Sequence, residues 1–339
     1  MSLLEVNNIS VCFRTRKGLI RAVNDVSFSV DSGKTLALVG ESGSGKSVSA
    51  MSILRLLDEN GYVERGEILF GEEEKTNLLQ CTDAQTRAVR GNLISVIFQE
   101  PMTALNPVLT IEKQLSEPFI IHRKLDKKQA WNASKSMLAD VGIPNPERVL
   151  KCYPHELSGG MRQRVMIAMA LACQPKLLIA DEPTTALDVT IQAQILRLMK
   201  GLQEKNGAAI LFITHDLGIV REMADDVAVM YCGEVVERVP APVIFQKGGY
   251  SHPYTEGLLA SLPGTQKLGR RLDAIPGVVP RPDALPKGCK FAPRCKYCTQ
   301  KCVEEEPPLF LMAQGHSVRC YYAEKGLRRS ENHAKLALG

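Results

Sequence analysis

The sequence predicts an α/β fold through about residue 245, followed by a small irregular segment that is rich in cysteine. Three observations predict this division. Short apolar runs, which favour buried parallel strands, alternate with longer amphipathic stretches, which favour helices. The periodicity fades after Pro240, where prolines begin to recur. Five of the ten cysteines then crowd between Cys289 and Cys320.

The elements of the first part can be placed in order along the chain. Helices are expected over Ser47–Leu57 and Ile191–Leu202. Residues from about 110 to 172 have a helical pattern, with breaks expected at Pro118 and around Pro144 and Pro146 because proline lacks the N–H of a helix interior. Such a stretch is a helical insertion in an α/β sheet. The expected strands are Val26–Val30, Thr35–Val39, Glu67–Phe70, Ile94–Phe98, Leu177–Ala180, Ile210–Thr214, Val227–Tyr231 and Val235–Val239.

Composition limits the classes of function. The chain has 339 residues, of which 45% are hydrophobic and 23% charged, ordinary values for a globular protein. A net charge of +5 is mild for this length and gives no indication of nucleic-acid binding. No apolar run is long enough for a membrane span, and residues 1–5 show no secretory signal. We therefore expect a cytoplasmic protein that reaches a membrane only through partners.

A phosphate-binding loop is the strongest motif. The run Gly40-Glu41-Ser42-Gly43-Ser44-Gly45-Lys46-Ser47 fits G-x-x-x-x-G-K-[ST] and lies between a predicted strand and a predicted helix. The glycines allow backbone N–H groups to curl around phosphate oxygens, and the helix N-terminus adds positive potential. Lys46 is expected to reach the β- and γ-phosphates, and the Ser47 hydroxyl to bind Mg²⁺. The residues expected to contact ATP here are Gly40, Ser42, Gly43, Ser44, Gly45, Lys46, Ser47 and Val48.

An acidic pair supplies the second half of this site. Asp181 and Glu182 directly follow the apolar run Leu177–Ala180, at the carboxyl end of a predicted strand, where ligands bind in such sheets. Asp181 is expected to hold Mg²⁺ through water. Glu182 is placed to polarise the attacking water.

A third run identifies a family. Leu157-Ser158-Gly159-Gly160-Met161-Arg162-Gln163-Arg164 resembles the signature sequence of ATP-binding-cassette proteins. It is a second anion site at a helix N-terminus. Such a site has a use if two subunits pair head to tail and Ser158, Gly159 and Gly160 contact the partner's ATP. The resemblance implies a nucleotide-binding domain with a RecA-like core, an antiparallel β subdomain and a helical subdomain over about residues 100–172.

Other motifs follow in the family's order, so that the resemblance covers roughly residues 3 to 245. Gln99 resembles the Q-loop glutamine, which contacts Mg²⁺, the attacking water and the membrane subunit. Ala186-Leu187-Asp188 resembles the D-loop. His215 resembles the switch histidine at the γ-phosphate. Phe13 lies where the family places an aromatic ring on adenine, although it fits a core strand position as well.

Longer stretches resemble the di- and oligopeptide (and nickel) importer branch. These include Gln99–Pro107 and Tyr153–Met161. The C-terminal run Gly288–Cys295, followed by Cys302, Glu306–Leu309 and Cys320, resembles the C-terminal segment of that branch. The resemblance implies an ATPase subunit that powers peptide import. Its partners would be two permease subunits, a homologous second ATPase subunit and an external binding protein, at the cytoplasmic face of the inner membrane.

The clustered cysteines predict a metal site. Disulfides are rare in cytoplasmic proteins, so a local cluster of thiols favours a metal or cofactor. Cys289, Cys295, Cys302 and Cys320 form a Cys₄ set, whose wide spacing favours a [4Fe–4S] cluster over zinc, since structural zinc usually uses tight C-x₂-C pairs. Cys298 is either a spare thiol or an alternative ligand. Arginines between Lys267 and Lys301 could neutralise an anionic cluster. The scattered cysteines are expected to be small core residues: Cys12, Cys81, Cys152, Cys173 and Cys232.

The sequence leaves the cargo and the class of ATPase open to an alternative each. Nickel or another small solute is the alternative cargo. A soluble cassette ATPase acting on DNA or the ribosome is the alternative class, although the short interval from Lys46 to Ser158 holds no coiled coil and the chain has one cassette. The expected domains are 1–245 for the nucleotide-binding domain, 246–323 for the cysteine-rich domain and 324–339 for a polar tail.

Overall fold

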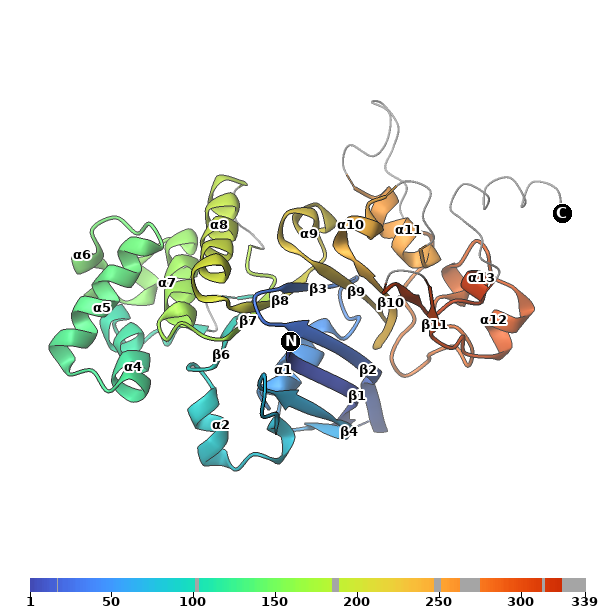
Figure 1. The fold of residues 1–339 in the computed structure, drawn as a ribbon, viewed down its shortest axis with the longest axis horizontal. Coiled ribbons are helices and arrows are strands. Elements are labelled where there is room, and N and C mark those ends of the chain that lie inside the picture. The colour runs from blue at the N-terminus through green and yellow to red at the C-terminus, as the bar shows by residue number, and fades with distance from the viewer. Residues whose placement is uncertain are drawn as a thin grey trace. The chain divides into compact units, whose positions relative to one another are not determined.

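The computed structural model of this chain describes residues 1–16, 18–100, 104–184, 189–246, 251–262, 275–312 and 315–324. These residues fall into two compact units (Figure 1). The helical unit comprises Met1–Leu4, Val30–Lys34 and Phe70–Ile213. The phosphate-loop unit comprises Glu5–Ser29, Thr35–Leu69 and the chain from Thr214 onward. No helix in the described ranges has both the length and the apolarity that a membrane crossing needs.

Two groups of strands build the phosphate-loop unit. In one, β1 (Ser2–Thr15) lies between β2 (Gly18–Asp31) and β4 (Gly61–Phe70). In the other, the strand order is β11-β12-β10-β9-β3. Strand β3 runs parallel to β9, with Leu36 opposite Asp226 and Val39 opposite Val229. The bounds of this second group are β3 Thr35–Val39, β9 Asp226–Tyr231, β10 Glu234–Pro240, β11 Phe310–Leu311 and β12 Ser317–Val318.

The C-terminal segment extends this sheet. Strand β12 pairs antiparallel with β10, placing Val318 opposite Glu237. The segment is therefore more regular than its sequence predicts, because short pieces of chain gain backbone hydrogen bonds from an existing strand edge. The helices and 3₁₀ turns of the unit are α1 Lys46–Ile53, α9 Leu217–Met223, α10 Ala241–Ile244, α11 Pro253–Ala260, η3 Ala292–Arg294, α12 Gln300–Glu304 and α13 Tyr321–Glu324.

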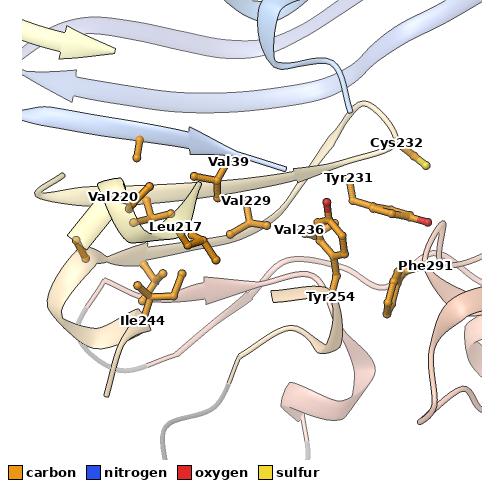
Figure 2. Packing of buried hydrophobic residues seen from close by; sticks show 14 residues of the cluster. Val39, Leu217, Val220, Val229, Tyr231, Cys232, Val236, Ile244, Tyr254 and Phe291 are labelled. Atoms are coloured by element: carbon orange, nitrogen blue, oxygen red, sulfur yellow. The ribbon is translucent and has the colours of Figure 1, made fainter. Parts of the chain in front are cut away.

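One hydrophobic cluster joins the strand before the phosphate loop to the C-terminal segment. All five residues of β3 are buried, as expected for a strand covered on both faces. Figure 2 shows Val39 and Val229 in the same cluster as Tyr231, Tyr254 and Phe291. The three aromatic rings pack on one another, with centroid distances of 4.7 Å, 5.3 Å and 5.5 Å. The C-terminal segment thus contributes Phe291 to the core that supports β3.

Parallel strands and a group of helices form the helical unit. Strand β7 (Leu177–Asp181) lies between β6 (Ile94–Ile97) and β8 (Ala209–Thr214), parallel to both. Its five residues are buried, which confirms the predicted strand. The remaining bounds are β5 Thr76–Asn77, η1 Leu78–Gln80, α2 Asp83–Val89, α4 Ile111–Arg123, α5 Lys127–Asp140, α6 Pro146–Leu150, η2 Pro154–Glu156, α7 Gly159–Leu171 and α8 Val189–Asn206.

The helical insertion is confirmed, but one predicted break in it is wrong. Helices α4, α5, α6 and α7 gather together in Figure 1. The break around Pro144 and Pro146 exists, since α5 ends at Asp140 and α6 begins at Pro146. Pro118, however, lies inside α4. Its neighbours Leu115 and Phe119 are buried, so packing of that helix face offsets the backbone hydrogen bond that proline cannot make.

Candidate active site

The phosphate loop has the backbone that only glycine allows at two positions. Gly45 is the N-cap of α1 with φ of 100°, and a Cβ there would lie 2.9 Å from the Ala22 carbonyl oxygen. A Cβ on Gly40 would run into the carbonyl oxygen of Met230. Side chains at either position would push the loop off the neighbouring backbone. The sequence motif therefore folds into a tight turn that opens directly onto the N-terminus of α1.

Lys46 is held over this loop. Its side chain is buried, and Nζ donates hydrogen bonds to the carbonyl oxygens of Gly40 at 2.8 Å and Glu41 at 3.0 Å. The backbone of Ser44 is also fixed, because its carbonyl oxygen accepts a hydrogen bond of 2.9 Å from the N–H of Gly233. An ammonium group at the mouth of a loop and a helix N-terminus forms a site for a polyphosphate.

In the helical unit, the structure brings Gln99 and Glu182 together. Asp181 ends β7 and is 5% exposed. The next residue, Glu182, has φ of 46°, a left-handed conformation that is costly for a residue with a side chain and is common at functional sites. Its N–H donates to Ile213 at 3.0 Å, and its carboxylate accepts a hydrogen bond of 3.1 Å from Gln99 Nε2. The strained turn aims the carboxylate at the predicted Q-loop glutamine.

The signature run forms an accessible helix N-terminus, as predicted. Ser158 is the N-cap of α7, and its Oγ accepts a hydrogen bond of 3.4 Å from the Met161 N–H. Nothing lies within 4 Å of a Cβ built on Gly159 or Gly160. The first turn is therefore open for an anion to approach.

The remaining predicted nucleotide contacts have mixed outcomes. His215 is exposed and follows β8, so it is accessible where the prediction needs it. Phe13 is half-buried on β1, and its ring covers Gly61 of β4, where a Cβ would lie 2.6 Å from the ring. Adenine stacking by Phe13 stays a prediction. Asp188 lies outside the described residues.

The four cysteines predicted as ligands line one cavity. Its volume is about 370 Å³, and Cys289, Cys295, Cys302 and Cys320 all contribute to its wall. Burial raises the pKa of Cys289 and of Cys295 to about 12. Cys298 is exposed and outside the lining, with Sγ directed to the Thr299 carbonyl oxygen. Within the described residues, no three His, Cys, Asp or Glu side chains have the spacing to hold a single metal ion. The cluster prediction is therefore not confirmed, although the four thiols line one cavity.

Two residues that the sequence does not single out contact the phosphate loop. Arg294 forms an ion pair with Glu41, so its charge faces the loop instead of neutralising the cysteine cavity. The hydroxyl of Tyr254 accepts a hydrogen bond of 2.7 Å from the Glu41 N–H. No local sequence signal could have found either contact, because each joins residues more than 200 positions apart.

The loop, the acidic pair after a buried strand and the open signature helix define a P-loop ATPase of the cassette type. Two family models match the chain: ABC transporter over residues 23–185, and the C-terminal region of oligopeptide/dipeptide transporters over residues 236–302. The chain belongs to the ABC transporter family and carries this C-terminal region.

Similar proteins agree with this assignment. The oligopeptide transport ATP-binding protein AppD of Bacillus subtilis is 52% identical, covering 97% of this chain and 99% of that protein. The dipeptide transport ATP-binding protein DppD of Escherichia coli is 46% identical, covering 95% of this chain and 97% of that protein. Among solved structures, the ATP-binding cassette MJ0796, a dimer bound to ADP and Pi, matches with a TM-score of 0.63 and 28% identity over 70% of this chain and 98% of that one.

Proposed function

We propose that this chain is the ATP-hydrolysing subunit that powers import of di- or oligopeptides. The observation that carries the proposal is the match of residues 236–302 to the C-terminal region of oligopeptide/dipeptide transporters, combined with 52% identity along nearly the whole chain to an oligopeptide transport ATP-binding protein. A cassette shared by all ABC transporters would support ATP hydrolysis alone. The C-terminal region is what narrows the cargo to peptides.

The proposed catalytic roles rest on the motif resemblance and are supported by the contacts within each unit. Lys46 and the N–H groups before α1 bind the β- and γ-phosphates. Mg²⁺, when bound with ATP, neutralises phosphate charge, and the oxygen donors of Ser47, Asp181 and Gln99 suit it. Glu182 accepts the proton of the attacking water, oriented by its hydrogen bond from Gln99. His215 contacts the γ-phosphate.

A second ATPase subunit completes the site in this proposal. Because Ser158, Gly159 and Gly160 leave the start of α7 open, this chain offers a second anion site besides its phosphate loop. Head-to-tail pairing with a homologous subunit, a paralogue, would place each signature against the other's ATP, with Asp188 at the same interface. The similar cassette MJ0796 forms a dimer, which supports such pairing.

The rest of the assembly is proposed on the same grounds. Two permease subunits contact the region after Gln99, an external binding protein delivers cargo to them, and the ATPase lies peripherally on the cytoplasmic face of the membrane. The proposed organisation of the chain is 1–245 for the nucleotide-binding domain, 246–323 for the cysteine-rich part and 324–339 for a polar tail.

The cysteine cavity is proposed to hold a [4Fe–4S] cluster. Its lining supplies four thiols, the donor set that such a cluster uses. The lack of single-ion spacing among the described residues counts against zinc more than against a cluster, because zinc draws four ligands to one point whereas each cluster iron takes one thiolate. Once held there, a cluster would cross-link four separate positions of the C-terminal segment.

Metal analysis of the anaerobically purified chain tests this. We expect iron and acid-labile sulfide in equal amounts. Cys289→Ser should lose both, whereas the control Cys298→Ser should keep both. Stoichiometric zinc without sulfide would replace the cluster by a zinc site. Loss of iron in Cys298→Ser but not in Cys289→Ser would make Cys298 the ligand.

Replacement of Glu182 by Gln tests the ATPase mechanism. We expect ATP binding to remain and hydrolysis in the assembled transporter to fall by about a hundredfold or more, the usual contribution of a positioned general base. Glu147→Gln, the same change at an exposed ion pair of the helical unit, is the matched control. Undiminished turnover in Glu182→Gln would refute the assignment.

The cargo is tested separately in the assembled transporter. Stimulation of ATP hydrolysis by di- or oligopeptides with their binding protein is expected. Stimulation by Ni²⁺ and not by peptides would establish the nickel alternative while leaving the ATPase assignment intact.

A further inference from the structure

The C-terminal segment reaches the phosphate loop through a two-pronged ion pair. Arg294, in the 3₁₀ turn η3, donates from Nη1 to Glu41 Oε2 at 2.6 Å and from Nη2 to Glu41 Oε1 at 3.1 Å. Two parallel N–H···O bonds fix direction as well as distance, which a single contact would not. Glu41 is the second residue of the phosphate loop.

Arg294 is itself held rigidly. Its side chain is 4% exposed, compared with 30% for Glu41. Nε donates a hydrogen bond of 3.0 Å to the Pro276 carbonyl oxygen, and the guanidinium carbon lies 5.8 Å from the centre of the Tyr231 ring and 5.9 Å from that of Phe291. The hydrogen bonds that Arg294 donates to the Glu41 carboxylate raise the pKa of Arg294, so the guanidinium stays charged. Because these contacts already restrict its side chain, Arg294 loses little further side-chain entropy when it pairs with Glu41.

The backbone of Glu41 is held from the same segment of the chain. Its N–H donates to the hydroxyl of Tyr254 at 2.7 Å, and Tyr254 is completely buried in the aromatic group with Tyr231 and Phe291 (Figure 2). The carbonyl oxygen of Glu41, in turn, accepts from Lys46 Nζ at 3.0 Å. Side chain, N–H and carbonyl of one loop residue thus connect the C-terminal segment to the phosphate-binding lysine.

From these contacts we infer that Arg294 is a positioning residue for ATP binding, acting through Glu41 on the phosphate loop and Lys46. The C-terminal segment thereby takes part in the nucleotide site without touching the nucleotide. The inference rests on the ATPase assignment alone and is independent of the cargo and of what fills the cysteine cavity.

Equilibrium titration of the full-length chain with a fluorescent ATP analogue tests it. Arg294→Gln should raise the Kd by about tenfold, the low end for loss of hydrogen bonds between charged groups, because Glu41 is partly exposed. Arg294→Lys should recover part of the affinity, since it keeps the charge but not the two-pronged geometry. In the assembled transporter, KM for ATP should rise while kcat changes less than twofold. The matched control is Arg281→Gln, which breaks the exposed ion pair with Asp283 in the same segment and should leave Kd unchanged.

A double-mutant cycle with Glu41→Gln separates positioning from general damage. If Arg294 acts through Glu41, the double variant should bind ATP about as weakly as either single variant. Losses that multiply would overturn the inference, as would an unchanged Kd in Arg294→Gln. Should Arg294→Gln fail to fold, Glu41→Gln alone removes the ion pair from its other side, and wild-type affinity in that variant would equally overturn the inference.

Discussion

Truncation of Phe291 tests whether the C-terminal segment is part of the core that supports the phosphate loop. The Phe291 side chain is 3% exposed, and its ring packs against Tyr231, Tyr254 and His252, with centroids 5.3 Å, 5.5 Å and 5.8 Å away. Because Tyr231 ends β9 and β9 pairs with β3, a cavity at Phe291 lies next to the strand that leads into the loop.

The expected cost can be worked from this packing. Removing a buried Phe side chain loses roughly 1.5 to 3 kcal/mol of burial, and the cavity left behind brings typical Phe→Ala losses to about 3–5 kcal/mol. The three aromatic contacts place Phe291→Ala in the upper half of that range, about 4 kcal/mol. Phe310→Ala is the control. Phe310 is only partly buried and, among the described residues, has one ring contact, with Tyr321 at 6.5 Å, so about 1 kcal/mol is expected.

Urea unfolding of the full chain with hydrogen exchange on peptides gives the readout. Phe291→Ala should lower the free energy of unfolding and speed exchange in β9 and β10 together with the segment after residue 275. Faster exchange confined to residues 275–324, with β9 protected as in the unsubstituted chain, would refute the shared core and make the C-terminal segment an independent folding unit. The single tryptophan, Trp131, lies in the helical unit, so its fluorescence separates unfolding of that unit.

Two further predictions concern the same unit. Gly45→Ala should weaken ATP binding and lower the free energy of unfolding by about 1–3 kcal/mol, because φ of 100° is unfavourable for alanine and its Cβ would lie 2.9 Å from the Ala22 carbonyl oxygen. Calorimetric unfolding with and without ATP measures both effects. Unchanged values would show that the loop tolerates a side chain. Burial raises the pKa of Cys232 to about 11 from an ordinary value of 9.0, so the folded chain keeps a proton that the unfolded chain releases. This stabilisation is complete below about pH 9 and is lost as pH rises toward 11, so Cys232 should contribute a fall of about 1 kcal/mol in unfolding free energy between pH 9 and pH 10. Urea unfolding of Cys232→Ala at the two pH values should lack this fall. The same pH dependence of the unfolding free energy in the variant and the unsubstituted chain would contradict the burial argument.

Local sequence patterns predict those strands and helix starts that depend on neighbouring residues alone. The sequence predicts a strand over Thr35–Val39, and the structure has it with the same bounds, because five consecutive apolar or small residues suit a strand covered on both faces. Gly45 at the N-cap of α1 and Ser158 at that of α7 also follow from local backbone and capping chemistry. Pro118 fails the same kind of rule, because packing of α4, which no local rule contains, outweighs the lost hydrogen bond.

Contacts between distant residues were beyond such patterns. The four cysteines of the cavity wall are the ones that the family resemblance indicates: Cys289, Cys295, Cys302 and Cys320. Their spacing alone does not distinguish them from Cys298. No motif or family resemblance predicts the ion pair between Arg294 and Glu41. Its residues lie in different predicted domains, and the paired strands β9, β10 and β12 together with the buried aromatic cluster bring the C-terminal segment to the phosphate loop.

The position of Arg294 connects the C-terminal segment physically to the phosphate loop. Arg294 precedes Cys295 directly, so the same 3₁₀ turn presents one residue to the phosphate loop and the next to the cysteine cavity. Phe291, which opens that turn, lines the cavity and also packs on Tyr231 and Tyr254 beneath Glu41. A turn this short cannot shift on its cavity side without moving the guanidinium on the other, since interiors are packed closely enough to transmit strain. One short turn therefore holds Glu41 of the phosphate loop on one side and forms part of the cavity wall on the other.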